Sequence, residues 1–183
     1  MMSQKNDNIQ SEFMKHYAPL HEGFTRFCSA RSYGIIDTED LVQESVLAAY
    51  SNFHKLRNPQ ALMAYMMRVA INHVNSKARR RKFSAEFDEK AFNKLLDLAP
   101  NADIALDAAL LYRSLRNLSP KLREPLELFE IAGFSIAEIA EMKGVNESAV
   151  KVRLHRARKQ LKNELEPFSA DLQQVFTSVI LLF

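Results

Sequence analysis

The chain has 183 residues, a formal net charge of +3 and 47% hydrophobic residues, which suffices for one or two small domains with real cores. Only four glycines and six prolines interrupt long stretches of 3.6-residue periodicity, so the sequence predicts an all-α protein. The single cysteine, Cys28, excludes a disulfide framework and a cysteine zinc site, and we expect it to be a core residue. The first residues contain no apolar signal region and the apolar C-terminal run is too short to cross a bilayer. We therefore expect a cytoplasmic protein without membrane insertion.

Positive charge is concentrated in two segments. Residues 77–82 carry five positive charges and no negative charge, and residues 151–165 carry six against the single acid Glu164. Residues 84–113, which lie between them, are net acidic. This arrangement predicts two separate contacts with a polyanion.

The N-terminal third reads as a series of helices. Residues 1–8 are expected to be a frayed start, and residues 9–18 and 19–31 are helical, with Pro19 in a first turn. The predicted inward side chains are Phe13, Tyr17, Leu20, Phe24 and Phe27. Gly34 interrupts the pattern, and Asp37 is the expected N-cap of the next helix.

The helix predicted over residues 37–53 carries one leucine on its polar side. Its expected inward residues are Val42, Val46, Ala49 and Phe53. Leu47 instead projects among the polar side chains Asp40, Gln43 and Glu44. It is equally well explained as an ordinary surface leucine or as an apolar anchor for a partner.

A long helix is predicted from Asn58 and Pro59 to about residue 80, after a loop at residues 54–58. Its expected inward residues are Leu62, Met66, Val69, His73 and Val74, with His73 as a core histidine. The opposite side is a polar strip of Tyr65, Arg68, Asn72, Asn75 and Arg79. Arginine binds phosphate, asparagine reads a base edge and tyrosine stacks on a base, so the strip fits either a nucleic-acid reader or a solvated helix face.

Residues 83–101 have weak periodicity and are predicted to be a linker with one helical turn at residues 91–98. Residues 103–115 are helical. Ser119 and Pro120 then begin a helix that ends near Gly133 and that Pro125 is expected to bend.

Residues 135–165 predict a helix-turn-helix. Ser135 and Glu138 have the spacing of a capping box, Gly144 can end the first helix in the left-handed conformation, and Asn146 can cap the second. Along the second helix the packing face is predicted to be Val150, Leu154, Ala157, Leu161 and Leu165. The opposite face is cationic and also carries Val152, which can contact a thymine methyl group. A solvated basic helix is the alternative, but the caps, turn and two-faced pattern together favour DNA binding.

In this order and spacing, four segments resemble the extracytoplasmic-function (ECF) group of sigma-70-type bacterial sigma factors. They are DTEDLVQESVLAAY (37–50), AYMMRVAINHVNSKARRR (64–81), LSPKLREPLELFEIAGFSIAEIA (118–140) and AVKVRLHRARKQL (149–161). The resemblance covers residues 13–165. It implies an all-α fold of two small helical domains joined by a flexible linker, with a sigma region 2-like domain at residues 8–82 and a region 4-like helix-turn-helix domain at residues 102–165. Residues 83–101 are then the linker, and residues 166–183 are an amphipathic tail that we expect to pack on the protein itself.

The resemblance implies core RNA polymerase and promoter DNA as partners, with an anti-sigma factor as regulator. It assigns polymerase binding to Asp40, Gln43, Glu44 and Leu47. It assigns the binding of melted minus-10 DNA to Tyr65, Arg68, Asn72, Asn75, Lys77, Arg79 and Arg80. It assigns the binding of the minus-35 duplex to Lys151, Val152, Arg153, His155, Arg156, Arg158 and Lys159. Relatives often have tryptophan at the position of Tyr65 and serine at the position of Val152.

A helix-turn-helix regulator that acts without polymerase is the alternative function, but such a protein does not need the outward Leu47. An enzyme finds no support, because the sequence has no phosphate loop and no nucleophile beside a base. No cofactor or metal is expected, since His16, His21, His54 and His155 have no metal-binding spacing.

Overall fold

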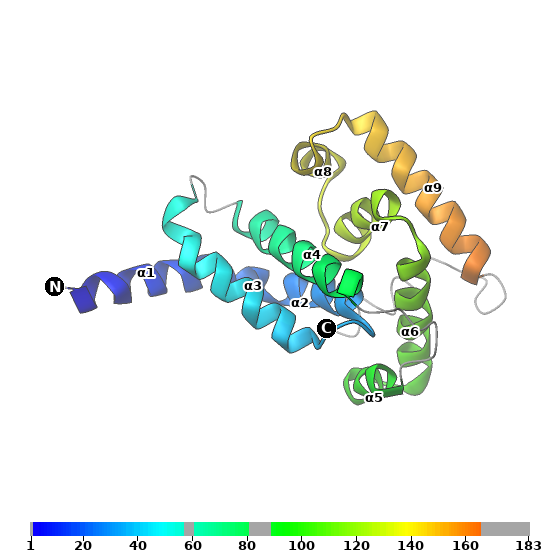
Figure 1. The fold of residues 1–183 in the computed structure, drawn as a ribbon, viewed down its shortest axis with the longest axis horizontal. Coiled ribbons are helices and arrows are strands. Elements are labelled where there is room, and N and C mark those ends of the chain that lie inside the picture. The colour runs from blue at the N-terminus through cyan, green and yellow to red at the C-terminus, as the bar shows by residue number, and fades with distance from the viewer. Residues whose placement is uncertain (1, 57–60, 81–88, 166–183) are drawn as a thin grey trace.

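The computed structural model describes residues 2–56, 61–80 and 89–165, and this part of the chain is helical without strands (Figure 1). The first half contains α1 (Met2–Tyr17), α2 (His21–Ser32), α3 (Thr38–Asn52) and α4 (Leu62–Arg80), with short 3₁₀ helices at Ala18–Leu20 and Phe53–Lys55. The second half contains α5 (Glu89–Leu98), α6 (Ala102–Asn117), α7 (Pro120–Leu126), η4 (Glu127–Ile131), α8 (Ile136–Lys143) and α9 (Glu147–Leu165). The predicted all-α class is confirmed for the described residues.

Helices α2, α3 and α4 pack on one another and form the centre of the first half. Asp37 caps α3 as predicted, because its side chain accepts hydrogen bonds from the amides of Glu39 and Asp40 at 2.8 and 3.3 Å. Gly34 in the preceding turn has a φ of 65°, a left-handed conformation that glycine adopts without strain.

Two details of the first half differ from the sequence prediction. Helix α1 begins at Met2 rather than near residue 9, since residues 2–8 contain neither glycine nor proline to stop a helix. In α3 the fully buried side chains are Leu41, Ser45 and, as predicted, Ala49, whereas Val42 and Val46 are only partly buried. Helix α3 contacts both α2 and α4, so its packing face is wider and turned from the single stripe that periodicity indicates.

The segment predicted to be a linker contains a full helix. Helix α5 spans Glu89–Leu98, ten residues rather than one turn, and it packs against α6. Leu95 is buried in that contact, while Leu96 and Leu98 are exposed. Helix α5 has one apolar side, which α6 covers, so its amphipathic pattern was present in the sequence over residues 89–98 alone.

Pro125 coincides with an irregular helix, as the sequence suggested. Helix α7 ends one residue later and continues as the π-helix η4, in which the amide of Ala132 donates to the carbonyl of Glu127 at 3.1 Å. Proline cannot donate a backbone hydrogen bond, and a wider turn lets the neighbouring carbonyls find partners. Gly133, with a φ of 76°, then ends the element where predicted.

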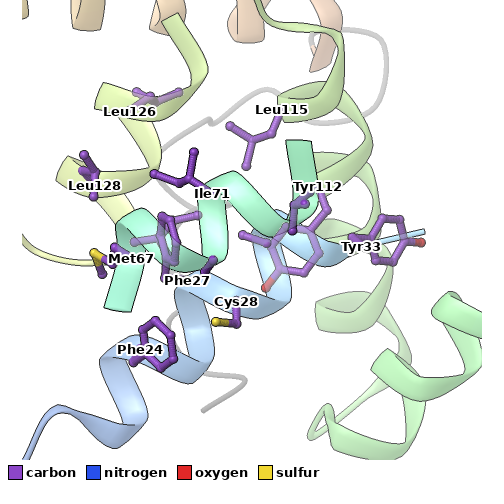
Figure 2. Packing of buried hydrophobic residues seen from close by; sticks show 14 of the residues in the cluster. Phe24, Phe27, Cys28, Tyr33, Met67, Ile71, Tyr112, Leu115, Leu126 and Leu128 are labelled. Atoms are coloured by element: carbon purple, nitrogen blue, oxygen red, sulfur yellow. The ribbon is translucent and has the colours of Figure 1, made fainter. Parts of the chain in front are cut away.

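The two halves share one cluster of buried side chains. Figure 2 shows Leu126 and Leu128 of the second half facing Ile71, Met67 and Phe27 of the first. Nearby, the rings of Tyr33 and Tyr112 have centroids 5.5 Å apart. The closed arrangement of the halves therefore has an apolar core, beside which lies a buried group of charges described below.

Candidate nucleic-acid interface

Hydrogen bonds and backbone conformation fix the helix-turn-helix formed by α8 and α9. The amide of Ser135 donates to Oε2 of Glu138 at 2.8 Å, and the amide of Glu138 donates to Oγ of Ser135 at 3.2 Å, which completes the predicted capping box. Hydrogen bonds from the Ser135 side chain and backbone lower the pKa of the Glu138 carboxyl. Gly144 ends α8 at a φ of 61°, and Oδ1 of Asn146 accepts the amide of Ala149 at 2.8 Å.

Helix α9 has the two faces that the sequence predicts. All residues of the predicted packing face are buried, namely Val150, Leu154, Ala157, Leu161 and Leu165. The exposed face comprises Lys151, Val152, His155, Arg156 and Lys159. Val152 is 47% exposed although it is apolar, which leaves its methyl groups available on a cationic surface. Such a surface can neutralise phosphates and contact base edges in a major groove.

Arg153 and Arg158 differ from the rest of the predicted DNA-binding set on α9. Arg153 is partly buried. Arg158 is held against its own half, because its Nη2 lies 2.6 Å from Oε1 of Glu130 and its guanidinium stacks 5.3 Å from the ring centre of Phe129. The positive charge of Arg158 is thus already paired at close range, whereas Lys151 at the start of the helix has only an exposed contact with Glu147 at 3.8 Å.

The polar strip lies on one side of α4, and one of its residues, Asn75, is bonded to a side chain of another helix. Arg68, Asn72 and Arg79 are exposed, as is the neighbouring Lys77, and Tyr65 is partly buried. Asn75 is also partly buried, and its Oδ1 accepts a hydrogen bond from Nη2 of Arg31 at 2.7 Å. Arg80 is the last residue of α4, and its side chain lies outside the described set, as do residues 57–60 of the predicted loop.

The outward surface of α3 consists of Asp40, Gln43, Glu44 and Leu47, all exposed. Leu47 is 65% exposed, the largest value among the described large apolar side chains. Histidine 73 is not the core residue that the pattern indicated. Nδ1 of His73 lies 2.7 Å from Oε2 of Glu44, because α3 and α4 pack side by side and bring the carboxylate to a partly exposed ring.

Sequence reasoning missed a buried charge cluster, which consists of Arg31, Arg123, Glu124 and Glu127. Nη1 of Arg31 lies 2.9 Å from Oε2 of Glu127, and Nε of Arg123 lies 2.5 Å from Oε1 of the same carboxylate. Burial lowers the pKa of the Arg123 guanidinium. The i,i+4 spacing of Arg123 and Glu127 was visible in the sequence, but nothing local linked either residue to Arg31.

Among the described residues, no group of three or more histidine, cysteine, aspartate or glutamate side chains is arranged to hold a metal ion. None of the described helices combines the length and apolar character needed to span a bilayer.

Comparison with known proteins gives the same family for sequence and fold. Residues 108–161 match the family model described as sigma-70, region 4. The chain is 34% identical over 130 residues to the ECF RNA polymerase sigma factor SigF of Caulobacter vibrioides, covering 70% of this chain and 71% of that protein. It is 30% identical over 136 residues to the RNA polymerase sigma-E factor of Streptomyces avermitilis, covering 74% and 75%.

A solved structure extends the likeness to nearly the whole chain. The structure of CnrH in complex with the cytosolic domain of CnrY matches with a TM-score of 0.65 and 25% identity, covering 91% of this chain and 96% of CnrH. The resemblance inferred from the four sequence segments is confirmed by these relatives. This chain belongs to the ECF family of RNA polymerase sigma factors.

Proposed function

We propose that the protein binds core RNA polymerase and directs it to promoters, reading minus-35 duplex DNA with α9 and capturing melted minus-10 DNA with α4. The observation that carries the proposal is the exposed cationic face of α9 behind a fully capped helix-turn-helix. In this assignment Lys151, Val152, His155 and Arg156 face the major groove and its flanking phosphates, and Arg153 and Lys159 lie on or near the phosphate backbone. Arg158 lies near the backbone too, but stays paired with Glu130 and neutralises no phosphate.

The polar strip of α4 is assigned to the melted minus-10 element. Tyr65 supplies a stacking face, Asn72 and Asn75 read base edges, and Arg68, Lys77, Arg79 and Arg80 bind phosphates. Extruding a base from the DNA stack costs a few kcal/mol. Stacking of that base on the protein, together with contacts made by polymerase, offsets this cost. No nucleotide hydrolysis is needed for a step of this size.

The outward surface of α3 is assigned to polymerase docking. Leu47 is an apolar anchor, and the acidic and polar side chains Asp40, Gln43 and Glu44 surround it. An apolar side chain within a polar rim matches the general anatomy of a protein–protein interface. This surface distinguishes a sigma factor from a regulator that binds DNA alone.

A protein inhibitor is included among the partners. CnrH, which this chain resembles in fold, was solved in complex with the cytosolic domain of another protein, CnrY. We assign this chain a corresponding anti-sigma factor, whose binding prevents access to polymerase.

Run-off transcription tests the proposal directly. Purified core polymerase is incubated with and without the protein on promoter-enriched DNA from its host. The expected result is a set of promoter-specific transcripts that appear only with the protein and fall at least tenfold with Leu47→Ala or Asp40→Ala. The matched control is Leu106→Ala, which removes a leucine of similar exposure, 48%, from α6.

Each other outcome rejects part of the proposal. DNA binding without a core-dependent transcript supports a polymerase-independent regulator. An equal loss with Leu47→Ala and Leu106→Ala rejects α3 as the docking surface. Loss of transcription with Arg156→Ala but not with Leu47→Ala leaves the DNA assignment in place and removes the polymerase assignment.

A further inference from the structure

The buried charge cluster joins the two halves of the protein. Arg31 comes from α2 of the first half, while Arg123, Glu124 and Glu127 come from α7 and η4 of the second. Arg31 is 1% exposed and Glu127 is fully buried. Nη2 of Arg123 also donates to the backbone carbonyls of Ala30 and Arg31 at 3.1 and 3.2 Å, so backbone and side chains both cross the boundary.

The cluster is asymmetric between the halves. Glu127 is bonded to Arg123 of its own helix, and Glu124 is paired with Lys143 of α8, also in the second half. The ionic partners of Arg31 all come from across the boundary, because the carboxylates within 4.0 Å of it in the described residues are Glu127 at 2.9 Å and Glu124 at 3.6 Å. Separation of the halves therefore leaves the second half internally paired and leaves Arg31 without an anion.

The other bond of Arg31 leads to the polar strip of α4. Its Nη2 donates to Oδ1 of Asn75 at 2.7 Å, while its Nη1 donates to Oε2 of Glu127. The guanidinium of Arg31 thus lies beside Asn75, a residue with a proposed DNA-binding role. Its planar fork faces the carboxylates of Glu124 and Glu127. The same fork geometry binds the oxygens of a phosphate, so a carboxylate and a DNA phosphate are alternative ligands for one arginine.

We propose that Arg31 is a DNA-phosphate ligand at the end of the polar strip, and that Glu124 and Glu127 occupy the phosphate position while the halves are closed. Binding of DNA at this position and closure then exclude each other. The proposal rests on the proposed function in taking the polar strip to be a DNA surface. It goes further by adding Arg31 as a phosphate ligand and the carboxylates of Glu124 and Glu127 as anions that compete with the phosphate.

Promoter geometry also requires the halves to separate. Elements centred about 10 and 35 base pairs before the start lie roughly 25 base pairs, or about 85 Å, apart on a duplex with about 3.4 Å per step. In the structure α4 packs on α2, α2 on η4, η4 adjoins α7, and α7 packs on α9. These contacts hold α4 and α9 in one body, and a compact chain of this length has a diameter of only about 40 Å. The closed protein cannot reach both elements.

The test compares two variants that break the same ion pair from opposite sides, in the full chain. Glu127→Gln removes the competing anion, and Arg31→Gln removes the proposed ligand. Both are expected to increase the radius of gyration in small-angle X-ray scattering by several ångströms above that of the wild type, for which a compact chain of this length gives about 16 Å. Glu164→Gln is the control, since it loses the same charge but accepts its hydrogen bonds from Asn117 and Gln160 within the second half.

The two variants are expected to have opposite effects on DNA. The probe is a mixed-sequence single-stranded 20-mer, because phosphate contacts do not depend on sequence. Glu127→Gln should bind it at least five times more tightly than the wild type, since a larger fraction of the protein is open. Arg31→Gln should show no gain, and its salt-dependence slope should be smaller than that of Glu127→Gln by about 0.7, the value for one phosphate on a single strand.

Each contrary result overturns a stated part of the proposal. Equal tightening by both variants rejects Arg31 as a DNA ligand. An unchanged radius of gyration in both rejects the charge cluster as the contact that holds the halves together. Circular dichroism verifies folding, and Glu124→Gln replaces Glu127→Gln if the latter does not fold. Because neither readout uses polymerase, absence of core-dependent transcripts rejects the proposed function without deciding this inference.

Discussion

Lys94 of α5 forms an ion pair with Asp37, the N-cap residue of α3, with Nζ 3.0 Å from Oδ2. Its Nζ also lies 3.2 Å from Oε1 of Glu39 in the first turn of the same helix. Helix α5, which follows the basic residues 77–82 in the chain, thereby contacts the N-terminus of α3, a few residues before the proposed docking surface. The side chains of Lys94 and Asp37 are 39% and 43% exposed, so solvent screens much of this attraction.

Asp37→Ala is expected to destabilise the protein more than Lys94→Met. The first change removes an N-cap worth about 1 kcal/mol, and the second removes an exposed ion pair worth less than about 0.5 kcal/mol. Urea unfolding of both variants at pH 7 measures the difference. Equal losses would show that the ion pair, and not the cap, determines the contribution of Asp37.

The same carboxylate makes the stability depend on pH. The hydrogen bond from Lys94, together with those from the backbone, lowers the pKa of Asp37 below its ordinary value of 3.8. A carboxyl with a lowered pKa in the folded state stabilises fully above its unfolded pKa and loses this contribution as pH falls through the folded value. The stability difference between wild type and Asp37→Ala should therefore shrink between pH 5 and the acid limit of folding. A constant difference over that range would contradict the assignment.

Glu127→Leu is expected to destabilise the protein more than Arg31→Met. Loss of Glu127 leaves two buried guanidiniums, Arg31 and Arg123, near the one remaining carboxylate of Glu124. Removing one partner from a buried ionic group costs about 3–5 kcal/mol. Loss of Arg31 leaves each glutamate with a cation of its own half, so a cost nearer 1–2 kcal/mol is expected, the range of one unpaired hydrogen-bonding group. Urea unfolding measures both, and the reverse order would reject the asymmetry of the cluster.

The sequence predicted local features well where neighbouring residues determine them. The capping box of Ser135 and Glu138, the left-handed Gly144 and the buried stripe from Val150 to Leu165 are all present. These features follow from backbone hydrogen bonding and helical periodicity within one segment. The outward position of Leu47 was predictable for the same reason.

The rest depends on contacts between distant segments. Arg31 and Glu127 are 96 positions apart, and each reads as an ordinary surface charge in its own helix. The pairing of His73 with Glu44 and the register of Leu41 in α3 likewise depend on which helices pack together. Periodicity gives the direction of a helix face but not the partner that covers it. The docking and DNA-binding roles of the site residues therefore remain predictions.

The capping box provides another prediction. Glu138→Gln is expected to lower stability at pH 7 and to remove a pH-dependent contribution, because the Ser135 hydrogen bonds that lower the pKa of Glu138 favour the charged carboxylate. This contribution is complete above the ordinary glutamate pKa of 4.5 and is lost as the pH falls through the lower pKa of the folded state. Ser135→Ala should cost about 1 kcal/mol at any pH at which the cap is charged.

Glu141→Gln is the matched control for this cap. Glu141 is exposed on the same helix and takes no part in the capping box. Thermal unfolding at pH 7 and at pH 3.5 should show a pH-dependent difference from wild type for Glu138→Gln and none for Glu141→Gln. The same pH dependence in both variants would assign the effect to net charge instead of the cap.

Two arginines of α9, two positions apart, are expected to behave differently toward DNA. Arg156 is exposed and faces away from the core, whereas Arg158 is paired with Glu130 and stacked on Phe129. Binding of each variant to a promoter duplex is measured over a range of salt concentrations. Arg156→Ala should weaken binding and lower the slope of log K against log salt by about 0.9, the value for one phosphate contact on a duplex.

Arg158→Ala should leave that slope within experimental error and lower the thermal stability of the protein instead. The loss combines an ion pair whose arginine is 44% exposed with a cation–π contact, each worth about 0.5–1 kcal/mol at such a site. Arg158→Lys separates the two contacts, since lysine retains the charge but not the planar stacking on Phe129. A slope reduced equally by Arg156→Ala and Arg158→Ala would mean that Glu130 releases Arg158 when DNA binds, and that Arg158 then contacts a phosphate as Arg156 does.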